Sequence, residues 1–169
     1  MGSLPIQIVD EDDRPVGSAT KQEAWDKGLI HRCVRLIIFN KAGQMLLQHR
    51  TPIKDIFPNC WDTAMAGHVD AGEDYEAAIK HEIVEELGFD DLTPKLLGKY
   101  HTNETIDGKK FNRFSQCYTA TTERTPTQFE KDKIDGWQWF DLNDVKKMVK
   151  EHPEKVTDGL RQVITIYYA

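Results

Sequence analysis

One segment of 23 residues, 67–89, constrains the chain more than any other. It reads GHVDAGEDYEAAIKHEIVEELGF, and Glu82, Glu85 and Glu86 stand in it at spacings of three and four residues. On a helix, such spacings place side chains on one face, so the three carboxylates would lie together and repel one another. A hard divalent cation offsets that repulsion, because it prefers carboxylate oxygens. The segment therefore predicts a helix with an acidic, metal-binding face.

The opposite face of the same helix is apolar. Ile79, Ile83 and Leu87 form a stripe that is typical of a helix packed on a core. Gly88 follows directly and can adopt the left-handed conformation that ends many helices. We therefore expect a helix over residues 73–87 that is buried along one face and acidic along the other.

Length, charge and cysteine content indicate a globular protein of one domain, residues 1–169. A chain of 169 residues can bury a sizeable core. Its formal net charge of −6 gives no sign of binding to a nucleic acid polymer. The sequence shows neither a long apolar run for a membrane span nor the pattern of a signal peptide. We expect a cytoplasmic protein with a small-molecule partner and no membrane partner. The oligomeric state stays open, with a homodimer as one option. The three scattered cysteines are expected to be buried thiols, and they are Cys33, Cys60 and Cys117.

Strand and helix patterns interleave along the chain. Strands are expected at residues 5–9, 33–40, 44–50, 61–67, 96–103, 111–122 and 136–141. Helices are expected at residues 21–28, 73–87, 141–152 and 157–168. This order predicts an α/β protein, with a mixed sheet flanked by helices. We expect an N-terminal hairpin extension over about residues 1–30, a core over about 31–148, and C-terminal helices to residue 169.

The acidic segment resembles the signature of the Nudix hydrolases, G-x5-E-x7-R-E-U-x-E-E-x-G-U, where U is a bulky apolar residue. One position departs, because His81 stands where the family has Arg. The alternative of a solvated acidic helix face explains neither Gly67 and Glu73 nor Gly88 directly after the helix. The resemblance implies the Nudix α/β/α sandwich and a MutT-like enzyme that cleaves a diphosphate. The matching residues are Gly67, Glu73, Glu82, Ile83, Glu85, Glu86, Gly88 and Phe89.

The resemblance also implies a role for several residues of the segment. Either Glu85 or Glu86 would deprotonate the attacking water, and the sequence does not choose between them. In the family the first glutamate pairs with the signature Arg, so here Glu73 and His81 would form this clamp. That pairing requires a protonated imidazole or a neutral imidazole that donates a hydrogen bond. The implied ligands of Mg²⁺ or Mn²⁺ are Glu82, Glu85, Glu86 and the carbonyl of Gly67.

The N-terminal half is similar to one branch of the family, the isopentenyl-diphosphate isomerases. The likeness lies in the motifs VDEDDRPVG and TPIKDIFPNCWD and in the Gly-His pair at residues 67–68. It implies a cysteine just before that pair, where this chain has Ala66, whose methyl group cannot exchange a proton. His31 and His68 match two histidine ligands of a second metal site, and we expect them in structural roles. The remaining ligand positions are occupied by Ala24, Arg113 and Ser115.

Hydrolysis of a small nucleoside-diphosphate-type or other organic diphosphate is therefore the expected function. The alternatives are an isomerase-like activity and a non-catalytic diphosphate-binding module. Arg50 and Lys54 correspond to residues that hold the diphosphate in the isomerases, although both could be ordinary surface cations. A further catalytic acid is expected from a late loop, with Glu130 ranked ahead of Asp132 and Asp135. Three tryptophans could stack on a base but are expected in the core, and they are Trp61, Trp137 and Trp139.

Overall fold

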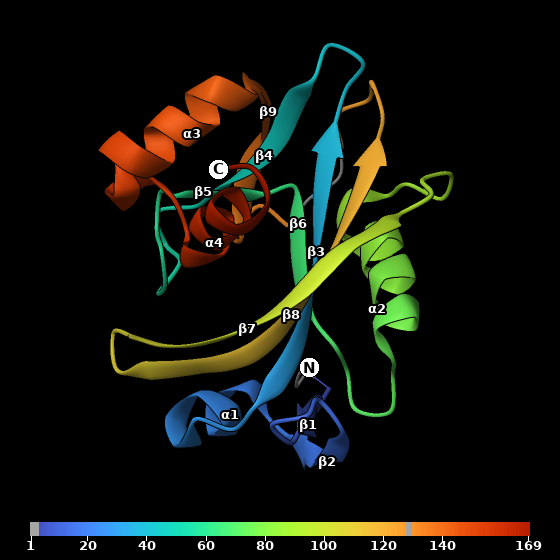
Figure 1. Cartoon of the computed structure of the whole chain (residues 1–169), viewed down its shortest axis with the longest axis vertical. Coiled ribbons are helices and arrows are strands. Elements are labelled where there is room, and N and C mark those ends of the chain that lie inside the picture. Colours follow the sequence, from blue (N-terminus) through green and yellow to red (C-terminus); the bar gives the residue numbers. More distant parts are fainter. Residues whose placement is uncertain (1–3, 128–129) are drawn as a thin grey trace.

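The computed structural model describes residues 4–127 and 130–169. Its strands form one mixed sheet with helices on both faces, which confirms the predicted α/β class (Figure 1). The strands are β1 (Ile6–Val9), β2 (Pro15–Ala19), β3 (His31–Phe39), β4 (Gln44–Arg50), β5 (Trp61–Thr63), β6 (Met65–His68), β7 (Lys95–Ile106), β8 (Lys109–Thr121) and β9 (Ile134–Asp141). The helical segments are α1 (Lys21–Lys27), α2 (Tyr75–Glu82), the π-helix η1 (Ile83–Leu87), α3 (Leu142–Glu151), the 3₁₀ turn η2 (Pro153–Lys155) and α4 (Asp158–Tyr167).

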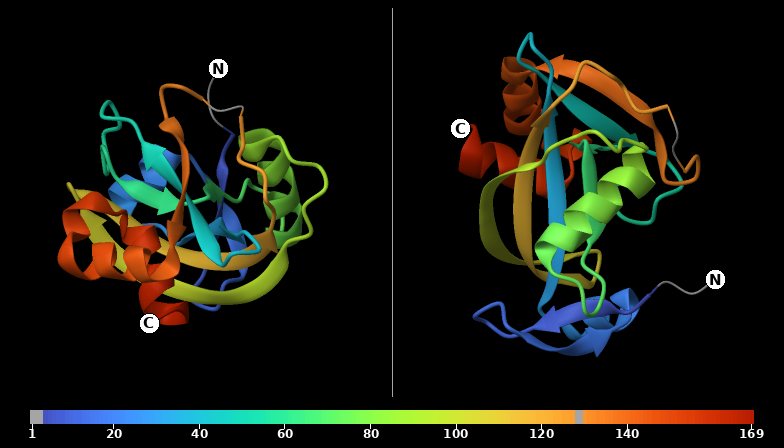
Figure 2. Two further views of the ribbon diagram at one scale, coloured as in Figure 1. Left: turned by 90° about the horizontal axis from the view of Figure 1, so that it is seen from above. Right: turned by 90° about the vertical axis from the view of Figure 1, so that its right-hand side faces the viewer.

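Strand β3 lies at the centre of the sheet and separates two layers of helices. It pairs in parallel with β8 and antiparallel with β6. The right-hand view of Figure 2 shows α2 on one side of β3 and the pair α3 and α4 on the other. The segment β1–β2–α1 lies at one end of the molecule, away from α3 (Figure 1). Within the described residues, every helix is too short or too polar to cross a bilayer.

Alternation along β3 gives the two faces of the sheet different characters. Val34, Leu36 and Ile38 pack with the buried face of α2 in one apolar core. The intervening residues face the other way, as successive side chains of a strand do. Arg35 is among them, and its guanidinium lies against the backbone of Gly159 at the start of α4. A polar wall is thus built into a sheet whose other face is apolar.

Turns and caps at the ends of the elements follow from local chemistry, and the burial predicted for the cysteines is confirmed. Gly28 caps α1 in the left-handed conformation with φ 69°. Asp107 and Gly108, with φ 51° and 77°, turn the hairpin between β7 and β8, as a two-residue turn requires. The hydroxyl of Thr157 caps α4 by accepting the N–H of Leu160 at 3.1 Å. The three cysteines are buried. The single-domain assignment stays a prediction.

The expected strand over residues 61–67 is wrong, because two strands lie there. β5 pairs with β4, whereas β6 pairs with β3. The chain changes partner at Ala64, whose carbonyl accepts the indole N–H of Trp137 at 3.0 Å. The strand pattern in the sequence does not show this change of partner.

The helix expected over residues 73–87 differs at both ends. It begins later, because the carboxylate of Asp74 caps it by accepting the N–H of Ala77 at 2.8 Å. Its last turn is the π-helix η1, which ends at Gly88 with φ 70°. π-Helical turns interrupt α-helices mostly in short pieces and often at functional sites. The apolar stripe is confirmed, since Ile79, Ile83 and Leu87 are all buried.

Candidate active site

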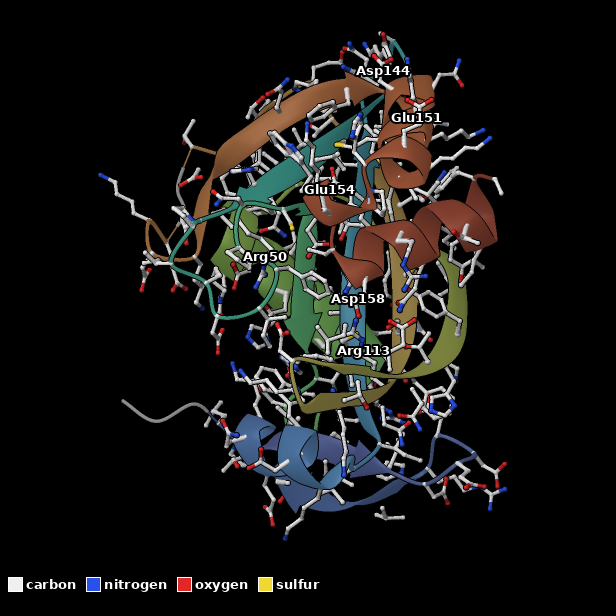
Figure 3. All side chains as sticks on the ribbon, turned by 90° about the vertical axis from the view of Figure 1, so that its left-hand side faces the viewer. Arg50, Arg113, Asp144, Glu151, Glu154 and Asp158 are labelled. Atoms are coloured by element: carbon white, nitrogen blue, oxygen red, sulfur yellow. The ribbon has the colours of Figure 1, made fainter. Side chains whose placement is uncertain are left out.

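A cavity of about 340 Å³ lies beside the acidic helix and receives side chains from segments far apart in the sequence. Its acidic end is lined by Gly67, Asp70, Glu82 and Glu86. Its basic side is lined by Lys21, Arg50, Lys54 and Lys133. Its third part, called the inner end below, is lined by two aromatic rings and by charged residues of both signs, namely Trp25, Arg35, Asp62, Phe111, Arg113 and Asp158. Figure 3 shows Arg50, Asp158 and Arg113 along one side of the molecule, below the acidic side chains of α3.

At the acidic end, Glu82 packs directly on the backbone of Gly67. A Cβ atom at position 67 would come within 2.7 Å of the carboxylate carbon of Glu82. A side chain at position 67 would clash with this carboxylate, so the absence of one in Gly67 allows Glu82 to lie there. Burial, and then the charge of Glu86, raises the pKa of Glu82 to about 7. Burial likewise raises the pKa of Glu86.

This arrangement fits a divalent cation. The donors are carboxylate oxygens, which Mg²⁺ and Mn²⁺ prefer, and their mutual repulsion is what a cation would relieve. Within the described residues, Glu82, Glu85 and His81 each offer one ligand atom within 4.8 Å of the others. Glu86 is outside that group but lines the same cavity. The structure therefore brings Glu85 close to Glu82 but leaves Glu85 exposed, whereas Glu82 and Glu86 both line the cavity.

His81 contacts two carboxylates at once. Its Nδ1 lies 3.1 Å from Glu73 Oε2, and its Nε2 lies 3.1 Å from Glu85 Oε2. Burial alone would lower the pKa of His81, but the hydrogen bond and charge of Glu73, helped by Glu85, outweigh burial and raise it. Both nitrogens donate only in the imidazolium form. The contact with Glu73 is the one that the predicted clamp needs, while the contact with Glu85 was not anticipated from the sequence.

The predicted diphosphate-binding residues lie on the basic side. Arg50 uses part of its guanidinium to hold the loop before β5, since its Nη2 donates to the Ile56 carbonyl at 2.7 Å. Lys54 is only part-exposed, and burial, with the charges of Arg50 and Lys133, lowers its pKa. Cations that close together repel one another, which favours an anionic ligand between them.

Among the late-loop acids, Glu130 lines the cavity and pairs with Lys133 at 3.1 Å. Asp135 instead pairs with His49 at 2.8 Å. Among the described residues, neither Asp132 nor Asp135 lines the cavity. This placement favours the residue that the sequence ranked first.

The two histidines inherited from the isomerase pattern lie together, with ring centroids 5.7 Å apart. Burial lowers the pKa of His31 to about 4, and burial also lowers the pKa of His68, so both are neutral. Within the described residues, neither belongs to a group of three or more metal-ligating side chains. Ala66 lines the cavity where a proton-donating residue would be needed for isomerisation.

The inner end was largely missed by the sequence reasoning. Arg35 donates from Nη1 to Asp62 Oδ1 at 3.1 Å, and Arg113 donates from Nη2 to Asp158 Oδ2 at 2.8 Å. All four side chains are buried. Burial works to lower the pKa of Arg35, but the charge of Asp62, together with Asp158 and neighbouring groups, outweighs burial, so this guanidinium stays charged. A charged residue in the middle of an apolar strand pattern, as in RCVRLIIF, was the available signal.

The three tryptophans expected in the core do pack against it. Trp137 and Trp139 pack against the core below α2, and Trp61 packs against the core below α4. Among the described residues that line the cavity, the one tryptophan is Trp25 of α1. Its ring lies 5.4 Å from that of Phe111 at an angle of 62°.

Comparisons with known proteins agree with this geometry. The NUDIX domain family model matches residues 29–160. An isopentenyl-diphosphate Delta-isomerase of Nocardia farcinica is 30% identical over 165 residues, which are 96% of this chain and 94% of the relative. An uncharacterized Nudix hydrolase of Nostoc sp. is 30% identical over 167 residues, which are 97% and 95% of the two chains. The crystal structure of DR0079 from Deinococcus radiodurans is similar with a TM-score of 0.78 and 24% identity, over 98% of this chain and 99% of that one.

Proposed function

We propose, from the premise that this chain belongs to the Nudix family, that it is a metal-dependent hydrolase of a small organic diphosphate. The observation that carries the proposal is the contact between Glu82 and Gly67 beside Glu86, because it brings mutually repelling carboxylates to one wall of the cavity. Cations line the same cavity, as a diphosphate requires. One cavity thus offers carboxylates for a metal ion and cations for a diphosphate.

The acidic end would hold the metal. Glu82 and Glu86 are its main protein ligands, with the carbonyl of Gly67 as a further oxygen and Glu85 as an outer ligand that His81 restrains. A bound Mg²⁺ or Mn²⁺ would supply charge neutralisation for the diphosphate and a lower pKa for water. The donor set suits either ion.

The other residues bind and orient. Arg50, Lys54 and Lys133 hold the diphosphate oxygens, and Arg50 offers the planar fork that suits phosphate. We assign removal of the water proton to Glu86 rather than Glu85, because Glu86 lines the cavity whereas Glu85 is exposed. Glu130, paired with Lys133, orients that lysine towards the substrate. The clamp of His81 and Glu73 fixes the loop ahead of the helix.

An isomerase-like activity is the second candidate, because a relative of nearly equal length carries that name. Ala66 is the observation against it, since its methyl group neither donates nor accepts a proton. A binding module without activity is the third candidate. The raised pKa of Glu86 within the cavity favours catalysis over binding alone.

One screen separates these candidates. Purified protein is incubated with nucleoside diphosphates, sugar-linked diphosphates and isoprenoid diphosphates, with Mg²⁺ or with a chelator, and both phosphate release and isomerisation are followed. We expect Mg²⁺-dependent hydrolysis of at least one compound and no interconversion of isopentenyl and dimethylallyl diphosphates. Ala66→Cys alone should not produce isomerisation. Isomerisation by the wild type would overturn the hydrolase proposal, and binding without turnover would favour the binding module.

A further inference from the structure

We propose that the inner end of the cavity is a specificity subsite, where Arg113 and Arg35 bind a neutral group that carries hydrogen-bond acceptors. The inference rests on the proposed hydrolysis, because it concerns the group attached to the diphosphate. It assigns a substrate class, namely polar diphosphates rather than those with a hydrocarbon tail.

The subsite is built from four segments of the chain. Arg35 comes from β3 and Arg113 from β8, which pair in parallel. Asp62 comes from β5, and Asp158 is the first residue of α4. The hydroxyl of Thr157 and the guanidinium of Arg35 both donate to Asp62 Oδ1, at 2.8 and 3.1 Å. The carboxylate of Asp158 accepts one hydrogen bond from Nη2 of Arg113 and another from the backbone N–H of Gly159. These contacts hold the wall rigid before any ligand arrives.

The wall carries more hydrogen-bond donors than it uses. Each guanidinium has five N–H donors. The Nε of Arg35 and the Nε of Arg113 are buried and have no partner among the described residues, and neither has the indole nitrogen of Trp25. Donors without partners inside a protein cost stability, and they are therefore uncommon. All three nitrogen atoms belong to side chains that line this cavity, which supports a role for these side chains in binding a ligand.

The charges of the wall select a neutral ligand. Each arginine has its own aspartate, so the inner end is neutral as a whole. An anion would meet two carboxylates there, and a cation would meet two guanidinium groups. A carbonyl or hydroxyl oxygen can accept from the arginines without an added charge. This differs from the basic side, where Lys133 pairs with Glu130 but, among the described residues, neither Arg50 nor Lys54 forms an ion pair.

A hydrocarbon is disfavoured by the same wall. Apolar groups against two buried ion pairs would leave the free donors unsatisfied and remove water from them. Buried ion pairs also stabilise a fold no better than apolar residues of the same volume. A cavity selected for a hydrocarbon tail would therefore be expected to carry apolar residues at these positions. The rings of Trp25 and Phe111 flank the subsite and suit a flat polar ring.

The test compares a diphosphate that carries a polar group with one that carries a hydrocarbon group, in four proteins. Hydrolysis of uridine diphosphate and of dimethylallyl diphosphate is measured with Mg²⁺, and the ratio of their kcat/KM values is the readout. Arg113→Met removes the donors, and Arg113→Lys keeps the charge beside Asp158 but loses the planar fork. Arg32→Met is the matched control, because Arg32 is equally buried, pairs with Asp13 at 2.7 Å and lies outside the cavity lining.

The wild type should favour uridine diphosphate by about tenfold or more, since polar sites discriminate strongly against ligands that leave them unpaired. Both Arg113 variants should lower that ratio by at least about tenfold. Arg32→Met should leave the ratio within about twofold of wild type, because it removes a comparable ion pair elsewhere. A wild-type ratio at or below one, or a ratio unchanged in Arg113→Lys, would overturn the subsite. Arg113→Lys decides the outcome if Arg113→Met does not fold.

Failure of the proposed function would look different. If the wild type hydrolyses neither compound, binding of uridine and of dimethylallyl alcohol is measured by saturation-transfer NMR. Uridine binding that Arg113→Lys abolishes and Arg32→Met retains would support the subsite while the hydrolase proposal fails. Equal binding of the alcohol and uridine, or no uridine binding, would overturn the subsite as well.

Discussion

The two ends of the cavity carry charge in opposite ways. At the acidic end, Glu82 and Glu86 repel each other, and the pKa of each is raised. At the inner end, Arg35 and Arg113 each have an aspartate within 3.1 Å. Like charges left uncompensated indicate a mobile ion that must arrive from solution. Opposite charges already paired, with donors to spare, indicate a neutral ligand that must match their geometry.

The largest effect is expected at the acidic end. Glu86→Gln removes one charge and the proposed base without changing the size of the side chain. We expect hydrolysis to fall about a hundred- to thousandfold, as for the loss of other groups that stabilise charge. Thermal unfolding should show a melting temperature at pH 8 no lower than that of wild type, because repulsion is relieved. Activity near that of wild type would show that Glu86 is neither the base nor a required metal ligand.

At the inner end, the expected loss is one of stability. Arg35→Met leaves Asp62 as a buried carboxylate without its guanidinium, and breaking such a pair costs about 3–5 kcal/mol. Urea unfolding measures this change in the free energy of unfolding. Arg161→Met is the control, since Arg161 pairs with Glu104 in a half-exposed position, where a pair contributes about 1 kcal/mol or less. Equal losses in the two variants would contradict the contrast between buried and exposed pairs.

The same contrast explains what could be predicted from the sequence. The acidic end comes from one short segment, so helical spacing and one glycine were enough to find it. The inner end needs four segments, 31–39, 61–63, 109–121 and 158–167, whose meeting depends on strand pairing and on the docking of α4. The sequence marked Arg113 only as a departure from the isomerase pattern. Long-range pairing decides which buried charges meet, and local pattern does not carry that information.

Within the acidic segment, the same limit appears on a smaller scale. Spacing predicted one face for all three glutamates, and Glu82 does lie close to Glu85, but it did not predict that Glu85 is exposed while Glu82 and Glu86 line the cavity. The helix was located correctly because its apolar stripe is strong. The geometry of its last turn depends on packing against β6, which the sequence does not reveal.

A smaller effect is expected from crowding the acidic end. Gly67→Ala places a methyl group where the carboxylate of Glu82 now lies, 2.7 Å from its carbon. Displacement of Glu82 by about 1 Å should lower kcat/KM about ten- to hundredfold. Gly17→Ala is the control, because a Cβ atom there meets nothing within 4 Å. Equal kcat/KM values for the two variants would show that catalysis does not depend on the position of the Glu82 carboxylate.

The smallest effect concerns the clamp and its dependence on pH. The folded-state pKa of His81 is raised. The stability that protonated His81 contributes to the clamp is therefore complete at pH values below its unfolded-state pKa of about 6.5. That contribution is lost as pH rises through the folded pKa. His81→Arg keeps its charge, and we expect it to retain activity a few-fold better than wild type at alkaline pH, in line with about 1 kcal/mol for a part-exposed pair. Superimposable pH–rate profiles of the two proteins would exclude His81 from the clamp.

Titration of Mn²⁺ into wild type and Glu82→Gln, followed by calorimetry, tests most directly whether the acidic end is a cation site. At pH 8 the carboxylate of Glu82, with its pKa raised to about 7, is charged. The wild type should bind Mn²⁺ at pH 8 and bind it more weakly at pH 6, where protons compete. Glu82→Gln should weaken binding at pH 8 by at least about tenfold. Mn²⁺ affinity that is the same in both proteins, or absent from the wild type at both pH values, would contradict a metal site between Glu82 and Glu86.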